Sequence, residues 1–200
     1  RAGLKVCLNP WSTTLHSERG RSLRAGQRFQ TMVSPSGRRS KAVASFACPR
    51  WRKYISNVYG QMAKLGFEVI WIEDDFRYHN HAPLDWGGDF SPAMLKLFSA
   101  KIGRKVSRQE LLKKVLRPGK PHPWRAILAG LWRDCSEATA GMIRDAVARA
   151  NPKAKLGLMS GNPDMHAVEG RDWQRLFNTL AIDGKAWHRP HFAAYGDSED

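Results

Sequence analysis

The amino-acid sequence predicts an α/β fold: part of a (β/α)8 TIM barrel with about four parallel strands and intervening helices, in one domain over residues 1–200. Short apolar runs alternate with longer segments of helical periodicity, an order that gives right-handed βαβ units and a parallel sheet. Polar clusters follow the apolar runs, at the sheet edge where active sites of such folds lie. Because a complete barrel needs roughly 250 residues, the chain corresponds to about half of one.

Strands are expected where apolar runs stop at polar or proline-containing turns, at residues 4–8, 67–72, 156–159 and 186–192. Helices are expected where apolar residues recur every three to four positions, over residues 49–65, 92–102, 107–116 and 123–150, and from about 171. Two helices begin with capping patterns, Ser91-Pro92 and Ser107 with Glu110. Residues 12–47 lack periodicity, which predicts a long irregular loop.

The composition excludes several classes of protein. Apolar residues make 42% of the chain and charged residues 26%, which is typical of a globular domain. No window approaches 18 uninterrupted apolar residues, so no transmembrane helix and no membrane partner are expected, and the first residues do not resemble a signal peptide. Three widely spaced cysteines predict neither a disulfide framework nor a zinc site and fit a reducing compartment, so a cytoplasmic location is expected.

The net charge of +15 is unusual and unevenly distributed. Residues 1–53 hold twelve lysines and arginines against Glu18, and residues 101–125 hold nine against Glu110. Two solvated basic surfaces explain this pattern, and a phosphate-binding patch for nucleic acid is the alternative. The chain has no helix-turn-helix, zinc-finger or RNP motif, and its aromatic residues do not interleave with the basic runs. These absences argue against nucleic acid as the partner.

Three carboxylates, Glu73, Asp74 and Asp75, directly follow a buried apolar run and are the candidate catalytic residues. Buried carboxylates cost solvation free energy unless they are paired, protonated or used. Side chains alternate along a strand, so Glu73 and Asp75 are expected on one face and Asp74 on the other. Crowding raises the pKa of one carboxyl, which suits a general acid. The alternative is a structural cluster that caps helices or pairs with Arg77.

The residues beyond the predicted strand ends supply hydrogen-bond donors, cations and aromatic rings. Histidines 79 and 81 have a spacing that metal ligands can have, but an isolated pair of this kind is a weak pattern, so no metal and no cofactor are predicted. The tryptophans in the strand-end loops, at 11, 86 and 187, could stack on a sugar ring, whereas those at 51, 132 and 173 lie on apolar helix faces. The predicted substrate-binding residues are Asn9, Trp11, His16, Arg77, His79, His81, Arg189 and His191.

The run VIWIEDDFRYHNH at 69–81, followed by GGDFSP at 87–92 and a Met-Leu-x-Leu-Phe helix, resembles the bacterial β-galactosidase-like glycoside hydrolases of clan A, near family 42. The segments NPW at 9–11, LH at 15–16, GLMS at 157–160 and RPH at 189–191 fit the same context. The resemblance covers residues 3–195 and corresponds to the central part of the catalytic barrel.

The resemblance implies a retaining mechanism with two carboxylates about 5–5.5 Å apart, an acid/base after the fourth strand and a nucleophile after the seventh. The family motif is Asn-Glu followed by an aromatic residue; here Asp74-Asp75-Phe76 stands in its place, so Asp75 corresponds to the acid/base and Asp74 to the asparagine. Related sequences carry Cys-x-Cys where this chain has residues 89–91, Asp-Phe-Ser, so no metal site is carried over. The seventh strand lies outside the chain, which predicts that the chain alone is inactive.

The sequence therefore predicts a sugar-processing hydrolase with a carbohydrate substrate. A non-catalytic carbohydrate-binding barrel is the first alternative, because aspartates replace the family's Asn-Glu pair. A basic nucleic-acid-binding module is the second alternative and rests on the net charge alone. A partial barrel has two unpaired sheet edges, which favour self-association into a homo-oligomer.

Overall fold

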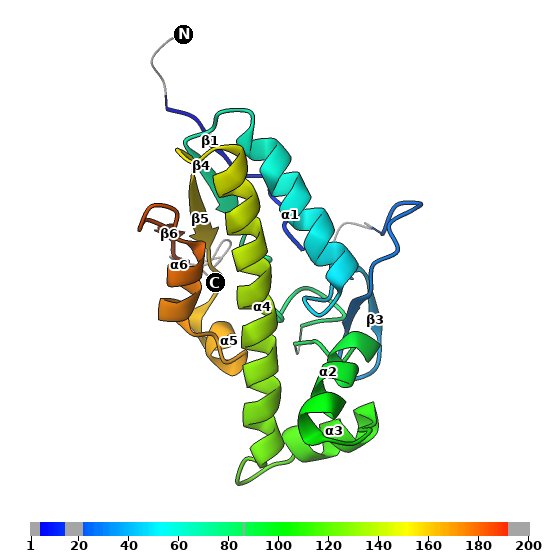
Figure 1. Ribbon diagram of the computed structural model, residues 1–200. Coiled ribbons are helices and arrows are strands. Elements are labelled where there is room, and N and C mark those ends of the chain that lie inside the picture. The colour runs from blue at the N-terminus through cyan, green and yellow to red at the C-terminus, as the bar shows by residue number, and fades with distance from the viewer. Residues whose placement is uncertain (1–4, 15–21, 86, 192–200) are drawn as a thin grey trace, which may run out of the picture.

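The computed structural model describes residues 5–14, 22–85 and 87–191 (Figure 1). The strands are β1 (Cys7–Leu8), β2 (Thr31–Val33), β3 (Arg39–Ala44), β4 (Val69–Ile72), β5 (Lys155–Met159) and β6 (Trp187–Arg189). The helices are α1 (Pro49–Ala63), α2 (Pro92–Ile102), α3 (Arg108–Val115), α4 (Pro123–Ala150), α5 (Pro163–Val168) and α6 (Trp173–Leu180). No helix in these ranges is long and apolar enough to cross a membrane.

Four parallel strands form the main sheet in the order β1-β4-β5-β6, which confirms the predicted parallel α/β fold. Their carboxyl ends lie at one edge, because all neighbouring strands are parallel. The loops that leave this edge are the long segments after β1 and β4 and the shorter segment after β5. β1 and β6 are the edges of the described sheet, and the expected homo-oligomer stays a prediction.

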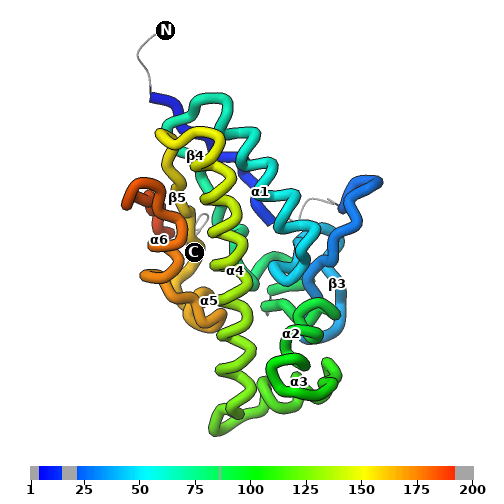
Figure 2. The backbone as a smooth tube through the Cα atoms, in the orientation of Figure 1, coloured from blue at the N-terminus to red at the C-terminus, as the bar shows by residue number. Residues whose placement is uncertain are grey.

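The two faces of the sheet differ in character. Ile70, Ile72, Leu156 and Leu158 are completely buried on the face that packs against the helices. The long helix α4 lies beside α1 on this side, and α6 packs against α4 (Figures 1 and 2). These residues alternate along β4 and β5 with residues of the opposite face, because successive side chains of a strand point to opposite sides.

The ring of Trp71 lies on this opposite face, directly over Gly157 of the neighbouring strand β5. The two residues are register partners, and a Cβ atom at Gly157 would overlap the indole. The absence of a side chain at position 157 therefore lets the ring lie flat across β5.

The segment 12–47 is not the irregular loop that the sequence predicted. Residues 31–33 and 39–44 pair as an antiparallel hairpin, with Gly37 at a φ of 87° in its turn. Most side chains of the hairpin are buried against the core. The sequence pattern hides these strands because β2 is three residues long and β3 begins with the polar run Arg-Ser-Lys.

The predicted helix starts are confirmed. Ser91 accepts a hydrogen bond from the Met94 amide and Ser107 from the Glu110 amide, as N-caps do. The short helix α5 was not predicted, because six residues show too little periodicity to separate a helix from a turn. The three cysteines are free thiols, with Cys48 and Cys135 buried and Cys7 exposed.

Replacing Gly157 with alanine should destabilise the fold by about 1–3 kcal/mol, because the new methyl group must displace the Trp71 ring or the strand. A thermal melt should show a lower midpoint, by roughly 2–4 °C per kcal/mol for a chain of this size. Gly130→Ala on α4 is the matched control, because a Cβ there meets only the end of the Arg133 side chain at 3.8 Å. An unchanged melting temperature for Gly157→Ala would show that the Trp71 ring does not lie against Gly157.

Candidate functional site

The candidate site lies at the carboxyl edge of the main sheet, where Glu73 directly follows β4 and Ser160 directly follows β5. Ile72 pairs with Leu158, so Glu73 comes next to the end of β5 at Met159. The predicted carboxylate cluster therefore stands where active sites of parallel α/β folds are built.

Asp75 is completely buried and has the role of a structural carboxylate in this arrangement. Its oxygens accept hydrogen bonds from the backbone amides of Thr13 and Thr14 at 2.8–3.0 Å and from the Thr14 hydroxyl at 3.0 Å. Burial raises the pKa of Asp75 to about 6, although the hydrogen bonds from Thr13 and Thr14 oppose the shift. The carboxylate thus holds the segment after β1 against the end of β4.

Glu73 is also buried, with 8% of its surface exposed. Unlike Asp75, it has a pKa above neutral pH. Burial, a hydrogen bond with Asp74 and the negative charges of Asp74 and Asp75 raise the pKa of Glu73 from 4.5 to about 8. The Asp75 amide donates to Glu73 Oε2 at 3.2 Å, and the Glu73 amide donates to Thr13 Oγ1 at 3.1 Å. Glu73 is therefore predominantly protonated at pH 7 and can donate a proton.

Asp74 is the most exposed of the three carboxylates and pairs with Arg77, whose Nη1 lies 3.4 Å from Asp74 Oδ2. The guanidinium lies over the backbone of Gly161, so closely that a Cβ atom there would overlap it. Arg77 is thereby held between the loop after β4 and the loop after β5. Glu73 and Asp75 are buried while Asp74 is partly exposed, but residues 74 and 75 form a turn beyond the end of β4, so the strand alternation expected from the sequence does not extend to them.

Polar groups from the other strands complete this edge. Asn9 Nδ2 and Arg189 Nη1 both approach the Met159 sulfur, at 3.7 and 3.5 Å. Ser160 Oγ lies 3.0 Å from His188 Nε2. Residues from β5, β6 and the segment after β1 thus meet at Met159, and Glu73 follows β4 next to this position in the sheet register.

Glu169 organises a second buried cluster beneath the loop after β4. It accepts hydrogen bonds from the amides of Tyr78 and His79 at 2.6 and 2.7 Å. Its carboxylate also lies 3.4 Å from His166 Nδ1 and 3.6 Å from Arg171 Nη2. Burial alone would raise the pKa of Glu169, but hydrogen bonds from His166 and His79 and the Arg171 charge outweigh it and hold the pKa well below its ordinary value.

His166 is neutral in this cluster, with its proton on Nδ1. The Gly161 amide donates to His166 Nε2 at 3.1 Å, so Nε2 is an acceptor and Nδ1 donates to Glu169. Burial lowers the pKa of His166, which agrees with this tautomer.

The remaining predicted binding residues have different environments. Trp11 is about half exposed, and its amide donates to Asn9 Oδ1 at 2.8 Å. The His79 ring faces Glu169, with Nδ1 3.3 Å from Oε1, so it supports the loop. His81 and His191 are exposed. Two predicted positions, His16 and Trp86, lie outside the described residues.

Trp187 is exposed, but it pairs with Gly157, halfway along β5, and does not lie at the carboxyl end of the strands. Trp51 and Trp132 are buried in the core, as predicted for the helix-face tryptophans, and Trp173 packs against it.

Sequence reasoning missed the roles of Thr13, Thr14 and Glu169. A threonine pair in a loop and a single glutamate between two short helices carry no motif, and their partners lie 60 or more residues away. The Ser160–His188 contact had a usable signal, because Ser160 directly follows one predicted strand and His188 lies within another.

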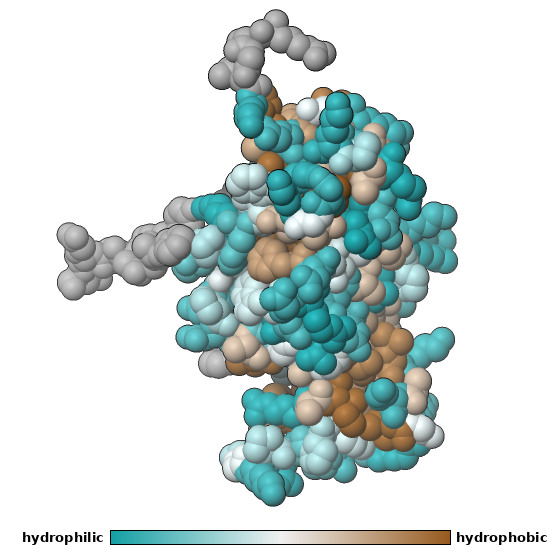
Figure 3. Space-filling model, turned by 60° about the vertical axis from the view of Figure 1, so that its left-hand side comes forward, coloured by the Kyte–Doolittle hydropathy of each residue, from teal (hydrophilic) through white to brown (hydrophobic). Residues whose placement is uncertain are grey.

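Among the described residues, no three His, Cys, Asp or Glu side chains stand in a group that could hold a metal ion. A cavity of about 70 Å³ lies between α3, α4 and α5 and is lined mainly by apolar residues such as Leu116, Leu128 and Val168. Figure 3 shows apolar surface in the same lower part of the molecule. Ligand pockets for small molecules measure roughly 300–1,000 Å³, so this cavity is too small for a sugar.

No family model matches the chain, and no curated protein matches it. A similar solved structure is the catalytic domain of β-amylase from Paenibacillus polymyxa, with a TM-score of 0.57 and 14% sequence identity. The match covers 94% of this chain and 60% of that chain, so the chain spans less than two thirds of the β-amylase domain. At this identity the likeness shows the fold alone. The chain has the fold of part of a (β/α)8 barrel.

Asp75→Asn should destabilise the protein by about 3 kcal/mol, because the amide nitrogen then faces donors that the carboxylate oxygen accepted. Urea unfolding at pH 7 measures the loss. Asp145→Asn on the exposed face of α4 is the control and should change stability by no more than about 0.5 kcal/mol. Equal stability of the two variants would contradict the structural role of Asp75.

Glu169→Gln should cost about 3 kcal/mol at pH 7, because it leaves the Arg171 charge buried without its anion. The pKa of Glu169 in the folded protein lies below its ordinary value of 4.5, so its stabilisation is complete above about pH 4.5 and is lost as the pH falls further. Unfolding of both proteins from pH 7 to pH 3 should show the difference shrinking. A constant difference would mean that the charge of Glu169 does not matter.

Proposed function

We propose that the chain is part of the catalytic barrel of a glycoside hydrolase of clan A and that Glu73 is its general acid/base. The observation that carries this proposal is a buried carboxyl group at the carboxyl edge of a parallel sheet, that of Glu73, whose pKa is raised by burial and whose neighbour Asp74 is paired with Arg77. The fold shared with a β-amylase catalytic domain agrees with it. A β-galactosidase-like specificity is the finer proposal and rests on the sequence resemblance.

The resemblance implies Asp75 as the acid/base, but its buried oxygens are occupied by Thr13 and Thr14. We therefore assign the proton transfer to Glu73 and a positioning role to Asp75. The Asp75 amide donates to Glu73 Oε2 at 3.2 Å, and the side chain of Asp74 also hydrogen-bonds the Glu73 carboxyl group, so both neighbours orient the acid.

In the proposed reaction, the Glu73 carboxyl proton passes to the glycosidic oxygen as the bond from this oxygen to the anomeric carbon breaks. A second carboxylate, from a part of the barrel outside these 200 residues, takes up the anomeric carbon as a covalent glycosyl intermediate. Glu73, now a carboxylate, accepts a proton from the water that releases the sugar. Arg77, Asn9 and Arg189 supply donors for sugar hydroxyl groups.

A non-catalytic carbohydrate-binding barrel is the second candidate. One specific observation favours it, because an aspartate pair replaces the Asn-Glu motif of the resembling family. This candidate predicts sugar binding that is unaffected by the protonation state of Glu73.

Glu73→Gln in the full protein should lower kcat/KM for an alkyl galactoside by about 10²–10⁴-fold, because glutamine cannot donate the proton. A dinitrophenyl galactoside, whose leaving group needs no proton, should lose far less in the cleavage step. In the unmodified protein, kcat/KM should fall as the pH rises through about 8, where Glu73 loses its proton, and Glu73→Gln should lose this limb. Initial rates for both substrates from pH 5 to pH 10 measure these effects.

Asp145→Asn serves again as the control and should leave both rates unchanged. Equal losses on the two substrates would contradict the acid role of Glu73. Sugar binding without turnover in the unmodified protein would establish the non-catalytic barrel instead.

A further inference from the structure

The two basic regions of the sequence converge on one lobe of the molecule. The lobe consists of residues 22–48, which include β2 and β3, and residues 92–122, which include α2 and α3; we call it the basic lobe. Arg108 Nη1 donates to the Pro35 carbonyl oxygen at 2.8 Å and thereby joins α3 to the turn of the hairpin. In Figures 1 and 2 the hairpin lies beside α2 and α3, although the two segments are far apart in the sequence.

Asp89 forms a second connection between the two segments. Its buried carboxylate accepts hydrogen bonds from the Val33 amide at 3.3 Å and the Ser91 amide at 2.8 Å, and it also contacts the Ser45 hydroxyl. The Phe90 amide in turn donates to the Val33 carbonyl at 2.9 Å. These hydrogen bonds hold the two segments of the basic lobe together, so the charges on one segment are held in place relative to those on the other.

The charge of this lobe is almost entirely positive. Residues 92–122 contain nine lysines and arginines and one acidic residue, and residues 22–48 contain five and none. Glu110 is already paired with Arg104, at 2.5 and 3.1 Å. Partial desolvation and the neighbouring charges of Lys114 and Arg117 lower the pKa of His122, which favours its neutral form. The field of the lobe attracts anions.

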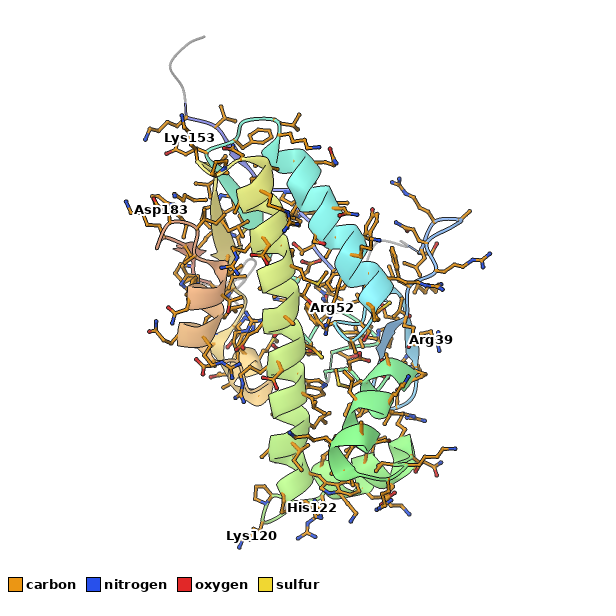
Figure 4. The ribbon with its side chains drawn as sticks, in the orientation of Figure 1. Arg39, Arg52, Lys120, His122, Lys153 and Asp183 are labelled. Atoms are coloured by element: carbon orange, nitrogen blue, oxygen red, sulfur yellow. The ribbon has the colours of Figure 1, made fainter. Side chains whose placement is uncertain are left out.

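Several of these cations are exposed to solvent. Arg38 and Arg39 lie on the hairpin, and Lys101, Lys113, Arg117 and Lys120 lie on and after α2 and α3. Figure 4 shows Arg39 beside α2 and Lys120 at the lower end of the molecule. The cations thus extend over the length of the lobe, which suits a long ligand with repeated negative charges.

The segments that form the basic lobe leave the main sheet at its carboxyl edge, where Glu73 also lies. Residues 22–48 belong to the segment that leaves β1, and residues 92–122 to the segment that leaves β4. Both segments start at the carboxyl edge, because the two strands are parallel neighbours. In a barrel, the loops of this edge form the walls of the substrate site.

We propose that the basic lobe selects an anionic polysaccharide, one whose sugar rings carry carboxylate groups, and guides it to the site around Glu73. This inference rests on the proposed glycoside hydrolase function and names its substrate class. Lysine and arginine side chains pair with the ring carboxylates of successive sugars, and neutral chains gain nothing from the lobe.

Trp124, which lies next to the basic lobe, favours this ligand over single-stranded nucleic acid. The ring of Trp124, at the start of α4, is packed by Phe98 at 5.2 Å and covered by Lys114 at 4.4 Å and Arg104 at 5.6 Å. Trp124 is only partly exposed and already engaged by these three side chains, so it is a poor platform for the base stacking that single-strand binding uses.

The test uses the full protein with Glu73→Gln, so that bound polymer is not cleaved. Calorimetric titrations compare polygalacturonate with a neutral galactan of equal length at two salt concentrations. We expect polygalacturonate to bind more tightly and to weaken as salt rises. The variant Lys113→Gln/Arg117→Gln/Lys120→Gln should weaken its binding by at least about fivefold, since exposed ion pairs each contribute little.

The matched control is Lys64→Gln/Arg149→Gln/Lys153→Gln, which removes the same charge from exposed positions at the opposite end of α1 and α4. It should leave binding within about twofold. Equal weakening by both triple variants would overturn the proposal in favour of net charge alone. Equal affinity for the neutral galactan, or tighter binding of a duplex or single-stranded oligonucleotide, would also overturn it.

The proposed function fails separately from this inference. Hydrolysis that is unaffected by Glu73→Gln would refute the acid role of Glu73, whatever the lobe binds. Hydrolysis of neutral chains at rates that the lobe variant does not change, together with absent polygalacturonate binding, would refute the substrate class and leave the acid role intact.

Discussion

A single buried carboxylate, that of Asp75, joins the chain segments from which the candidate site is built. An ionised group without water is costly unless its oxygens are satisfied, and here the amides of Thr13 and Thr14 satisfy them. The segment after β1 must therefore lie against the end of β4. Thr13 extends the connection further. Its hydroxyl oxygen lies 2.8 Å from the Tyr59 hydroxyl oxygen of α1 and accepts a hydrogen bond from the Glu73 amide. The position of the acid depends on this network.

Much of the fold could be predicted because its signals are local. The caps at Ser91 and Ser107, the proline at the start of α1 and the apolar runs of β4 and β5 depend on neighbours in sequence. The hairpin β2–β3 could not be predicted, since its stability comes from contacts with distant residues such as Asp89. In short strands the burial by the rest of the protein outweighs the intrinsic preference of the chain.

The candidate site was predictable in composition but not in the roles of its members. The run Glu73-Asp74-Asp75 indicates a carboxylate cluster, but β4 ends at Ile72 and residues 74 and 75 form a turn, so strand alternation does not describe how the three side chains are arranged. The donors that satisfy Asp75 lie about 60 residues away, so the sequence near the run does not show which of the buried carboxyl groups is satisfied. The same limit applies to Glu169, because nothing near it in sequence indicates that it will accept the amides of Tyr78 and His79.

The contact between Arg77 and Gly161 has a consequence for how relatives of this protein should be compared. The guanidinium rests where any larger residue at 161 would place its first carbon atom. The position of the Arg77 charge, near Glu73 in the sequence, thus depends partly on the absence of a side chain at Gly161 in the loop after β5. A comparison that aligns only charged and catalytic residues would overlook this position, although a homologue with alanine there would have to place its arginine elsewhere. Position 161 should therefore be compared among relatives together with the charged positions.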